Sequence, residues 1–331
     1  MSRNRRAAIR PYFFEVFTIV NLLLVHLLLV RRTGGVLTTL PSIALIIGPA
    51  LVIQCIAGVA IRWAVLRVRG GAAGAYLRIV RSLGWLLDTL RLLLFGVLMV
   101  HAYAWIKLVV PVLHPALYDQ QLWDLDRNLF FGLSPNVFFL SLFSHPLALG
   151  TIDWTYANIF VASMNIAFAF FLSAPSRRFR VAFADGNTAM WLIGAWLYML
   201  LPSIGPAYRF PDVWLALAPL MPRTHELQTM LIQNYQVMQR FGGGAGGKIE
   251  VLYGVAAFPS LHVAFQMFAV LWMRKVWRYG EVVFGVFLLF IFLGSVVTGW
   301  HYLIDSYAGL VLAIACYLPI ARHSRIGRWV R

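Results

Sequence analysis

Charged residues are scarce in this chain of 331 residues: Asp, Glu, Lys and Arg make up 12% of it, whereas 61% of the residues are hydrophobic. Soluble globular domains carry about 25% charged residues, so the composition excludes that class and indicates a membrane protein. Cysteine is almost absent too, and Cys55 and Cys316 both fall inside apolar segments. We expect no disulfide, and two such residues say nothing about the redox compartment.

Acidic residues are fewer than basic ones: the chain has 12 Asp and Glu and 28 Lys and Arg, which gives a net charge of +16. A basic excess is compatible with nucleic-acid binding. However, the cytoplasmic loops of membrane proteins also collect Lys and Arg, and this explanation is much the commoner one for an apolar chain. We therefore expect no nucleic-acid partner.

Long apolar runs are abundant, and a hydrocarbon core of about 30 Å needs about 20 apolar helical residues per crossing. The runs predict an all-α, polytopic integral membrane protein with about eight transmembrane helices. The expected spans are 12–30, 43–66, 85–110, 154–174, 182–201, 259–277, 281–298 and 303–321. The stretch 136–150 is apolar but short and contains prolines, so we expect a re-entrant or interfacial piece there.

The basic residues orient these spans. With eight crossings, 20 of the 28 Lys and Arg residues fall on the side of both termini. Because cytoplasmic loops are enriched in positive charge, we expect both termini to be cytoplasmic. The loops 111–153 and 202–258 would then lie on the external face, which is periplasmic or lumenal depending on the source.

The segment Phe258-Pro259-Ser260-Leu261-His262 begins one of the last spans. Proline suits the first helical turn, and the free amides that follow it lie at the positive end of the helix dipole. Such a helix start favours an anion, to which the Ser260 hydroxyl can add a hydrogen bond. An ordinary capped helix with a histidine at headgroup depth explains the same residues.

A second segment, Gly299 to Asp305, places His301 and Asp305 four residues apart. On a helix this spacing stacks them on one face, where the carboxylate accepts a hydrogen bond from one ring nitrogen. The other nitrogen is then free to act as a nucleophile or base. A structural His–Asp pair is the alternative. A zinc site of two histidines and one aspartate fits the residue types, but the HExxH spacing is missing and helix amides favour an anion, so we expect no metal.

These two segments resemble the second and third signature motifs of the type 2 phosphatidic acid phosphatase superfamily. The Phe-Pro-Ser-Leu-His and His-Tyr-x-x-Asp forms resemble its inositol phosphorylceramide synthase branch more narrowly. Upstream, the proline-rich stretch 200–209 resembles the first motif of that branch. The resemblance implies a six-helix phosphatase-type core within residues 85–331, preceded by a two-span region at 1–84.

The resemblance also implies roles for the residues of both motifs. His301 would attack phosphorus and form a phospho-histidine, Asp305 would orient it, and His262 would protonate the departing oxygen. Ser260 would bind the phosphate, and no cofactor is required.

Two features of the superfamily are missing. An arginine usually precedes the third-motif histidine by six residues, where this chain has Ser295, and the usual first motif, a lysine followed by Arg-Pro, is absent. Lys107 followed by His114-Pro115 is a near-match that we attribute to coincidence. We expect Arg209 to supply the cation, because a guanidinium binds phosphate oxygens in a bidentate manner.

The external loops contain further candidates. Residues 223–240 read as an amphipathic helix, suited either to lie in the interface as a lid or to pack on the protein. Asp124 and Asp126, in an acidic cluster that begins at Asp119, could contact a lipid headgroup, although solvated loop charges are commoner. Tyr208 and Tyr302 are further possible lipid contacts.

We expect an enzyme whose partners are membrane lipids. The first hypothesis is a phosphotransferase that moves a phospho-headgroup from a phospholipid to a lipid hydroxyl. The alternative is a phosphatase that hydrolyses phosphatidate or a polyprenyl phosphate or diphosphate with the same residues. A non-catalytic lipid transporter or scaffold is the third possibility, and it requires the His–Asp pair to be structural.

Overall fold

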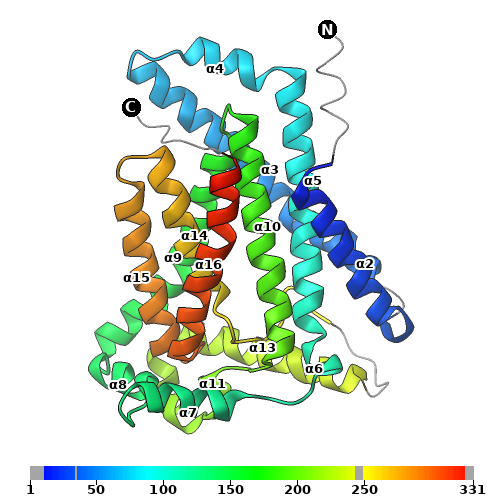
Figure 1. The fold of residues 1–331 in the computed structure, drawn as a ribbon. Coiled ribbons are helices and arrows are strands. Elements are labelled where there is room, and N and C mark those ends of the chain that lie inside the picture. Colours follow the sequence, from blue (N-terminus) through cyan, green and yellow to red (C-terminus); the bar gives the residue numbers. More distant parts are fainter. Residues whose placement is uncertain (1–10, 34–35, 243–248, 325–331) are drawn as a thin grey trace.

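The computed structural model describes residues 11–33, 36–242 and 249–324. Within these ranges the chain is helical and forms no strand, which confirms the predicted fold class. A helix lies at each of the eight predicted spans. They are α2 (Phe13–Thr33), α3 (Leu40–Val68), α5 (Leu83–Leu108), α9 (Pro146–Leu172), α10 (Arg177–Leu200), α14 (Leu261–Val276), α15 (Gly280–Val297) and α16 (Leu303–His323). Most of these helices run side by side as a bundle, with α2 and α3 inclined against it (Figure 1).

Five stretches of the described chain are long and apolar enough to cross a membrane. These are α3 with the preceding turn η1 (Val36–Thr39), α5 with its continuation α6 (Val110–Leu113), α9, α15 and α16. In α2 the apolar part is shorter, α14 has 16 residues, and α10 begins with several arginines. The chain is therefore a helical membrane protein, while the count of eight crossings stays a prediction.

Large apolar side chains cover the outside of the bundle. Leu45 and Ile53 on α3 are 77% and 65% exposed, and Val282 on α15 is 67% exposed. A soluble protein rarely leaves so many large apolar groups on contiguous helix faces. These faces suit contact with lipid tails.

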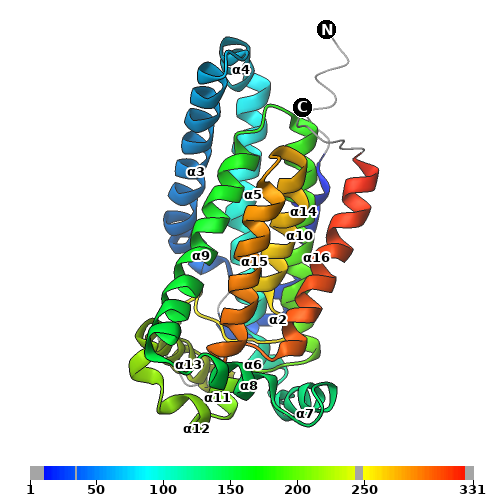
Figure 2. The same ribbon diagram turned by 90° about the vertical axis from the view of Figure 1, so that its left-hand side faces the viewer.

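The two ends of the bundle differ in structure (Figures 1 and 2). The short helix α4 (Ala73–Val80) covers one end, where α9 also turns into α10 and α14 into α15. The other end carries α7 (Asp119–Leu129), α8 (Pro135–Leu142), α11 (Pro206–Arg209), α12 (Asp212–Leu215), η2 (Ala218–Leu220) and α13 (Pro222–Gly242). The described part of loop 202–258 is thus largely helical, and the amphipathic helix predicted at 223–240 is present as α13.

The stretch 136–150, predicted as one re-entrant or interfacial piece, belongs to two helices in the structure. Helix α8 ends at Leu142, and Pro146 already begins α9. The reason is local, since His145 caps α9 by accepting the Leu147 N–H and Pro146 suits a first helical position. The membrane helix therefore starts eight residues before the predicted position 154.

The N-terminal two-span region packs directly on the remainder of the bundle. Helix α2 contacts α5 and α10, and α3 contacts α5 and α9. The division at residue 84 falls close to the turn between α4 and α5, and it stays a prediction. Both chain ends lie outside the described residues, so their predicted cytoplasmic location stays a prediction too.

Aromatic side chains fill the core between the helices. Phe171 of α9 stacks on Phe183 of α10 with ring centroids 3.7 Å apart, and the fully buried Trp272 of α14 packs edge-on against both. Where α3 meets α9, Gly58 brings the backbones together: a Cβ atom at this position would overlap the Ala169 carbonyl oxygen. Close approach at Gly58 therefore holds α3 against α9.

We expect Gly58→Ala to destabilise the protein by about 1–3 kcal/mol, because the added methyl group forces α3 away from α9. Thermal unfolding in detergent measures the effect. Gly48→Ala on the same helix is the matched control, since nothing lies within 4 Å of the position a Cβ would take there. Equal melting temperatures for the two variants would contradict the close packing.

Candidate active site

Helix α14 begins within the segment Phe258 to His262, where Ser260 is its cap. The Ser260 hydroxyl accepts the Val263 N–H at 3.4 Å, and the Ser260 N–H donates to the Asp305 carbonyl oxygen at 2.9 Å. Ser260 is fully buried and does not line the cavity described below. Its observed contacts therefore join the two segments, and its predicted role in binding phosphate stays a prediction.

Helix α16 approaches this cap very closely. A Cβ atom on Gly309 would overlap the backbone carbonyl oxygen of Ser260. Glycine is thus required at the crossing of α14 and α16 for the two helix starts to lie side by side. This contact brings residues 258–262 and 299–305 together, as the sequence predicts.

His301 lies in the connection between α15 and α16, and the hydrogen bond at its Nδ1 defines its tautomer. Nδ1 lies 2.8 Å from the carbonyl oxygen of Ala257 and 3.5 Å from Oδ2 of Asp305. A carbonyl oxygen only accepts, so Nδ1 carries the hydrogen and Nε2 keeps its lone pair. The predicted orienting role of Asp305 is thus shared with the Ala257 carbonyl, which makes the shorter contact.

Asp305 also holds the start of its own helix. Its Oδ2 accepts the Tyr302 N–H at 2.9 Å, while Oδ1 has no hydrogen-bond partner. The carboxylate therefore lies between the helix start and the His301 ring.

The surroundings of His301 keep its imidazole neutral. Burial lowers the pKa of His301 to about 3, the positive charge of Lys107 adds to this shift, and the bond to Ala257 opposes it. A neutral ring with a free Nε2 is the form that attacks an electrophile.

His262 lies beside His301, with ring centroids 5.9 Å apart. Its ring packs edge-on against Phe160 of α9 at 4.3 Å and near Tyr156 at 5.8 Å. Both histidines line a cavity of about 470 Å³ that continues between α3, α5, α9 and α10. The structure therefore brings the two predicted catalytic histidines together at one end of a long, largely apolar cavity.

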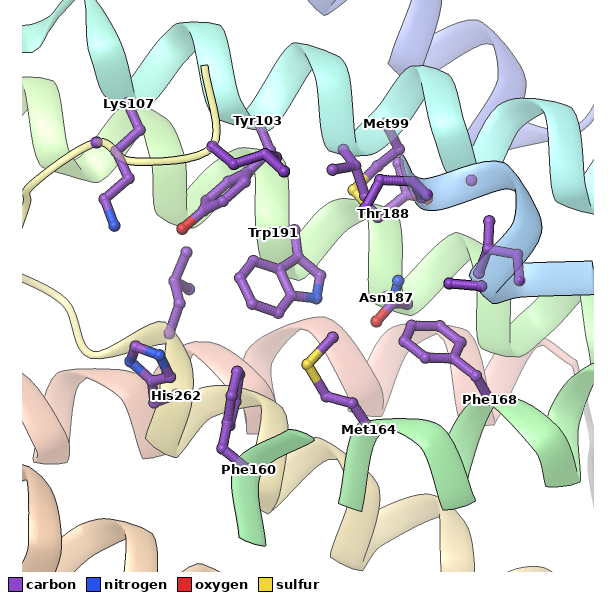
Figure 3. Close-up of a pocket in the computed structure, with 18 of the residues that line it drawn as sticks. Met99, Tyr103, Lys107, Phe160, Met164, Phe168, Asn187, Thr188, Trp191 and His262 are labelled. Carbon is purple, nitrogen blue, oxygen red and sulfur yellow. The ribbon is translucent and has the colours of Figure 1, made fainter. Parts of the chain in front are cut away.

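Lys107, near the end of α5, lines this cavity, and Arg209 does not. Figure 3 shows Lys107 and His262 on opposite walls of the same end of the cavity. The Lys107 ammonium lies 5.6 Å from the centre of the Tyr198 ring. Arg209 is exposed, and its guanidinium lies 5.5 Å from the centre of the Phe210 ring. Arg209 is therefore placed away from the cavity, and Lys107, attributed above to coincidence, is the cation beside the histidines.

The structure separates the predicted lipid contacts. Tyr208 lines the cavity and donates its hydroxyl hydrogen to the Gln228 carbonyl of α13. Tyr302 is fully buried, does not line the cavity, and donates to Asp119 at 2.9 Å. Asp124 is exposed and bonded to Gln120 on its own helix. Of this group, Tyr208 alone reaches the cavity.

Asp126 has a structural role, because its carboxylate binds the start of α16. It accepts the Leu303 N–H at 2.6 Å and the Ile304 N–H at 2.9 Å. These are two of the amides that a helix leaves unpaired at its N-terminus. Burial raises the pKa of Asp126 to about 6, although both amide bonds lower it. The side chain is 2% exposed and is therefore not a solvated loop charge, and both carboxylate oxygens accept these amides.

Asp119 lies two turns before Asp126 on the same face of α7 and binds a different loop. Its carboxylate accepts the Ile204 and Gly205 N–H groups at 2.9–3.1 Å, besides the Tyr302 hydroxyl. Burial raises the pKa of Asp119, and the hydrogen bonds oppose this shift. Asp119 and Asp126 were not predicted to be positioning residues, although their spacing of seven residues places both on one helix face.

The proline-rich stretch 200–209 makes hydrogen bonds to both histidine segments. Ser203 accepts the Ala257 N–H with its carbonyl oxygen at 2.8 Å and the Phe258 N–H with its hydroxyl at 3.1 Å. The Ala207 N–H donates to Gly299 at 3.0 Å. Residues 200–209, which resemble a first motif, therefore hold the two histidine segments in position.

Within the described ranges, no three His, Cys, Asp or Glu side chains are grouped closely enough to hold a metal ion.

Comparison with known families gives one match. The family model described as PAP2 superfamily matches residues 120–318, which is more than half of the 331 residues. The match includes His262, His301 and Asp305 and leaves out Lys107 and the helices before it. It supports the superfamily and does not distinguish the inositol phosphorylceramide synthase branch. Searches of curated proteins and of solved structures gave no match.

We expect Asp126→Ala to lower the melting temperature and the turnover together. The substitution leaves the Leu303 and Ile304 amides unpaired, at a cost of about 1–3 kcal/mol for each buried group. Asp124→Ala on the same helix is the control, because that carboxylate is exposed. Thermal unfolding and activity assays of the two variants measure the difference, and a wild-type result for Asp126→Ala would refute the positioning role.

Proposed function

The chain belongs to the PAP2 superfamily and is therefore an enzyme of the phosphatase or phosphotransferase type acting on phosphate esters; we propose that it transfers a phospho-headgroup from a phospholipid to a lipid hydroxyl. The observation that carries the proposal is the position of His301. Its Nε2 is the unpaired ring nitrogen, and the residue lines the cavity together with His262 and Lys107.

The geometry supports a two-step reaction through a phospho-histidine. In the first step His301 Nε2 attacks phosphorus, the bond from phosphorus to the glycerolipid oxygen breaks, and His262 gives its proton to that oxygen. In the second step a lipid hydroxyl loses its proton to His262 and attacks phosphorus, and the P–N bond breaks. Both histidines then return to their initial states.

Lys107 is the group best placed to stabilise the negative charge that develops on the phosphate oxygens. Preorganised positive charge in a site that excludes water contributes strongly to such catalysis. We assign to Lys107 the role predicted for Arg209. This cation and the two histidines supply the functions that a metal ion would otherwise provide, so we propose that the enzyme is metal-independent.

The covering of the cavity favours a lipid acceptor over water. Leu227 and Leu231 of α13 line the cavity, and Tyr208 and Trp300 line it close to His301. Apolar walls at this end exclude water from a phospho-enzyme and admit an amphiphile. Hydrolysis of a lipid phosphate uses the same residues and is the alternative outcome of the experiment below. The charge distribution of the loops supports an external location for this site.

The cation assignment is tested by a matched pair of substitutions. We expect Lys107→Met to lower kcat/KM on the order of 10²-fold to 10³-fold, and Arg209→Met to lower it at most a few-fold. His301→Ala should abolish turnover with the fold retained, as judged by unchanged thermal unfolding. A larger loss for Arg209→Met than for Lys107→Met would restore the sequence-based assignment, and wild-type turnover by His301→Ala would refute His301 as the nucleophile.

The reaction type is tested by the fate of a labelled headgroup phosphate. Purified protein is incubated with a labelled phospholipid, with and without diacylglycerol or ceramide as the acceptor. We expect the label to appear in a new lipid only when an acceptor is present. Release of inorganic phosphate at the same rate with and without acceptor would identify a phosphatase instead.

A further inference from the structure

The cavity at the histidines extends far beyond the space that a phosphate needs. Lining residues on α9 follow one face of the helix at intervals of four, as Tyr156, Phe160, Met164 and Phe168. Twelve residues of helix between the first and the last correspond to about 18 Å. The cavity is therefore an elongated channel that runs along the bundle, away from the histidines (Figure 3).

Polar side chains interrupt the largely apolar wall of this channel away from the histidines. Trp191 and Met164 lie between the histidine end and Asn187 in Figure 3. Asn187 of α10 is 4% exposed, its side chain makes no hydrogen bond in the described structure, and its buried oxygen lacks a partner. Gln54 of α3 lines the same cavity, and its carbonyl oxygen also has no partner.

Arg180 completes this polar inner section. It lies seven residues before Asn187 on α10, hence on the same helix face, and is 2% exposed. One amino group donates to Thr89 and the guanidinium lies 4.4 Å from the centre of the Trp85 ring, while Nε and Nη1 have no hydrogen-bond partner among the described residues. Three side chains with unsatisfied hydrogen-bonding atoms therefore line the channel away from the histidines.

The length of the apolar section matches one leaflet of a membrane. Tyr198, beside Lys107, and Asn187 both line the cavity from α10, eleven residues apart. Eleven helical residues correspond to about 16 Å, close to half of the 30 Å hydrocarbon thickness of a bilayer. A single lipid tail of ordinary length fits this section when its phosphate lies at the histidines.

We propose that the channel holds one hydrocarbon tail of the lipid substrate and that Asn187, Gln54 and Arg180 form a polar stop that limits its length. This inference rests on the proposed function. A tail that ends before Asn187 contacts apolar wall only. A longer tail packs against the Asn187 and Gln54 amides and the Arg180 guanidinium, whose unused hydrogen-bonding capacity an alkyl chain cannot satisfy, and this disfavours its binding.

The N-terminal region contributes to this limit. Ile47, Ala50, Leu51 and Gln54 of α3 line the channel, yet α3 lies outside the residues matched by the family model. The added helix thus forms one wall of the tail channel and brings Gln54 to the polar stop.

The test compares substrates that differ in tail length alone. The probes are monoacylglycerol phosphates with one saturated tail, lengthened in two-carbon steps from shorter to longer than one leaflet, and kcat/KM is measured for each in mixed micelles. For wild-type protein we expect kcat/KM to fall about tenfold once the tail exceeds the apolar section.

In Asn187→Leu, kcat/KM should fall only with tails that are several carbons longer, because the leucine removes an unsatisfied amide and extends the apolar wall. Asn158→Leu is the matched control, since Asn158 of α9 is exposed and does not line the channel. If Asn187→Leu does not fold, Gln54→Met tests the same point from α3. Thermal unfolding of each variant reports on folding.

The outcomes separate the inference from the proposed function. If the tail length at which kcat/KM falls is unchanged in Asn187→Leu or in Gln54→Met, while the wild-type protein is active, the polar stop alone is overturned. Absence of turnover with every probe and with the labelled phospholipid overturns the proposed function and the inference together.

Discussion

Two buried carboxylates on one helix face hold the site in place. Asp119 and Asp126 of α7 accept hydrogen bonds from four backbone amides and one hydroxyl, in two loops that are distant in sequence. Moving a carboxylate out of water is costly, and burial raises the pKa of both groups. Amides at a helix start and in a tight loop offset this cost, because they would otherwise be unpaired.

The position of His301, the proposed nucleophile, follows from the hydrogen bonds of Asp119 and Asp126 through short links. Asp119 binds the Tyr302 hydroxyl, the Tyr302 N–H binds Asp305, and the Asp305 carboxylate contacts His301. At the same ring nitrogen, the Ala257 carbonyl accepts from Nδ1 while the Ala257 N–H donates to Ser203. The imidazole is therefore oriented at Nδ1 by two groups that are themselves hydrogen-bonded, and its Nε2 is left unpaired for the proposed reaction.

The sequence predicted the features that depend on local pattern. Apolar length located all eight helices, and the motifs located His262, His301 and Asp305, because helix starts are readable along the chain. The helical stacking expected of His301 and Asp305 was wrong, since His301 precedes α16, although the two side chains still lie 3.5 Å apart. For the cation the sequence indicated Arg209, whereas Lys107 lines the cavity with the histidines, because only tertiary packing brings α5 to the site. Asp126 was misread for the same kind of reason, since its partners lie 177 and 178 residues away.

The cavity is enclosed in part by the N-terminal region, where α3 packs on α5 and α9. Gly58 allows α3 to lie directly on α9, and the same helix places Gln54 on the channel wall. A phosphate site at the end of a bundle could otherwise be open to the bilayer along its length. With α3 in contact, the apolar space beside His262 is lined from α3, α5, α9 and α10. The proposed catalytic groups and the proposed limit on tail length thus lie on different parts of the chain, which are joined by the packing of α3 on α9.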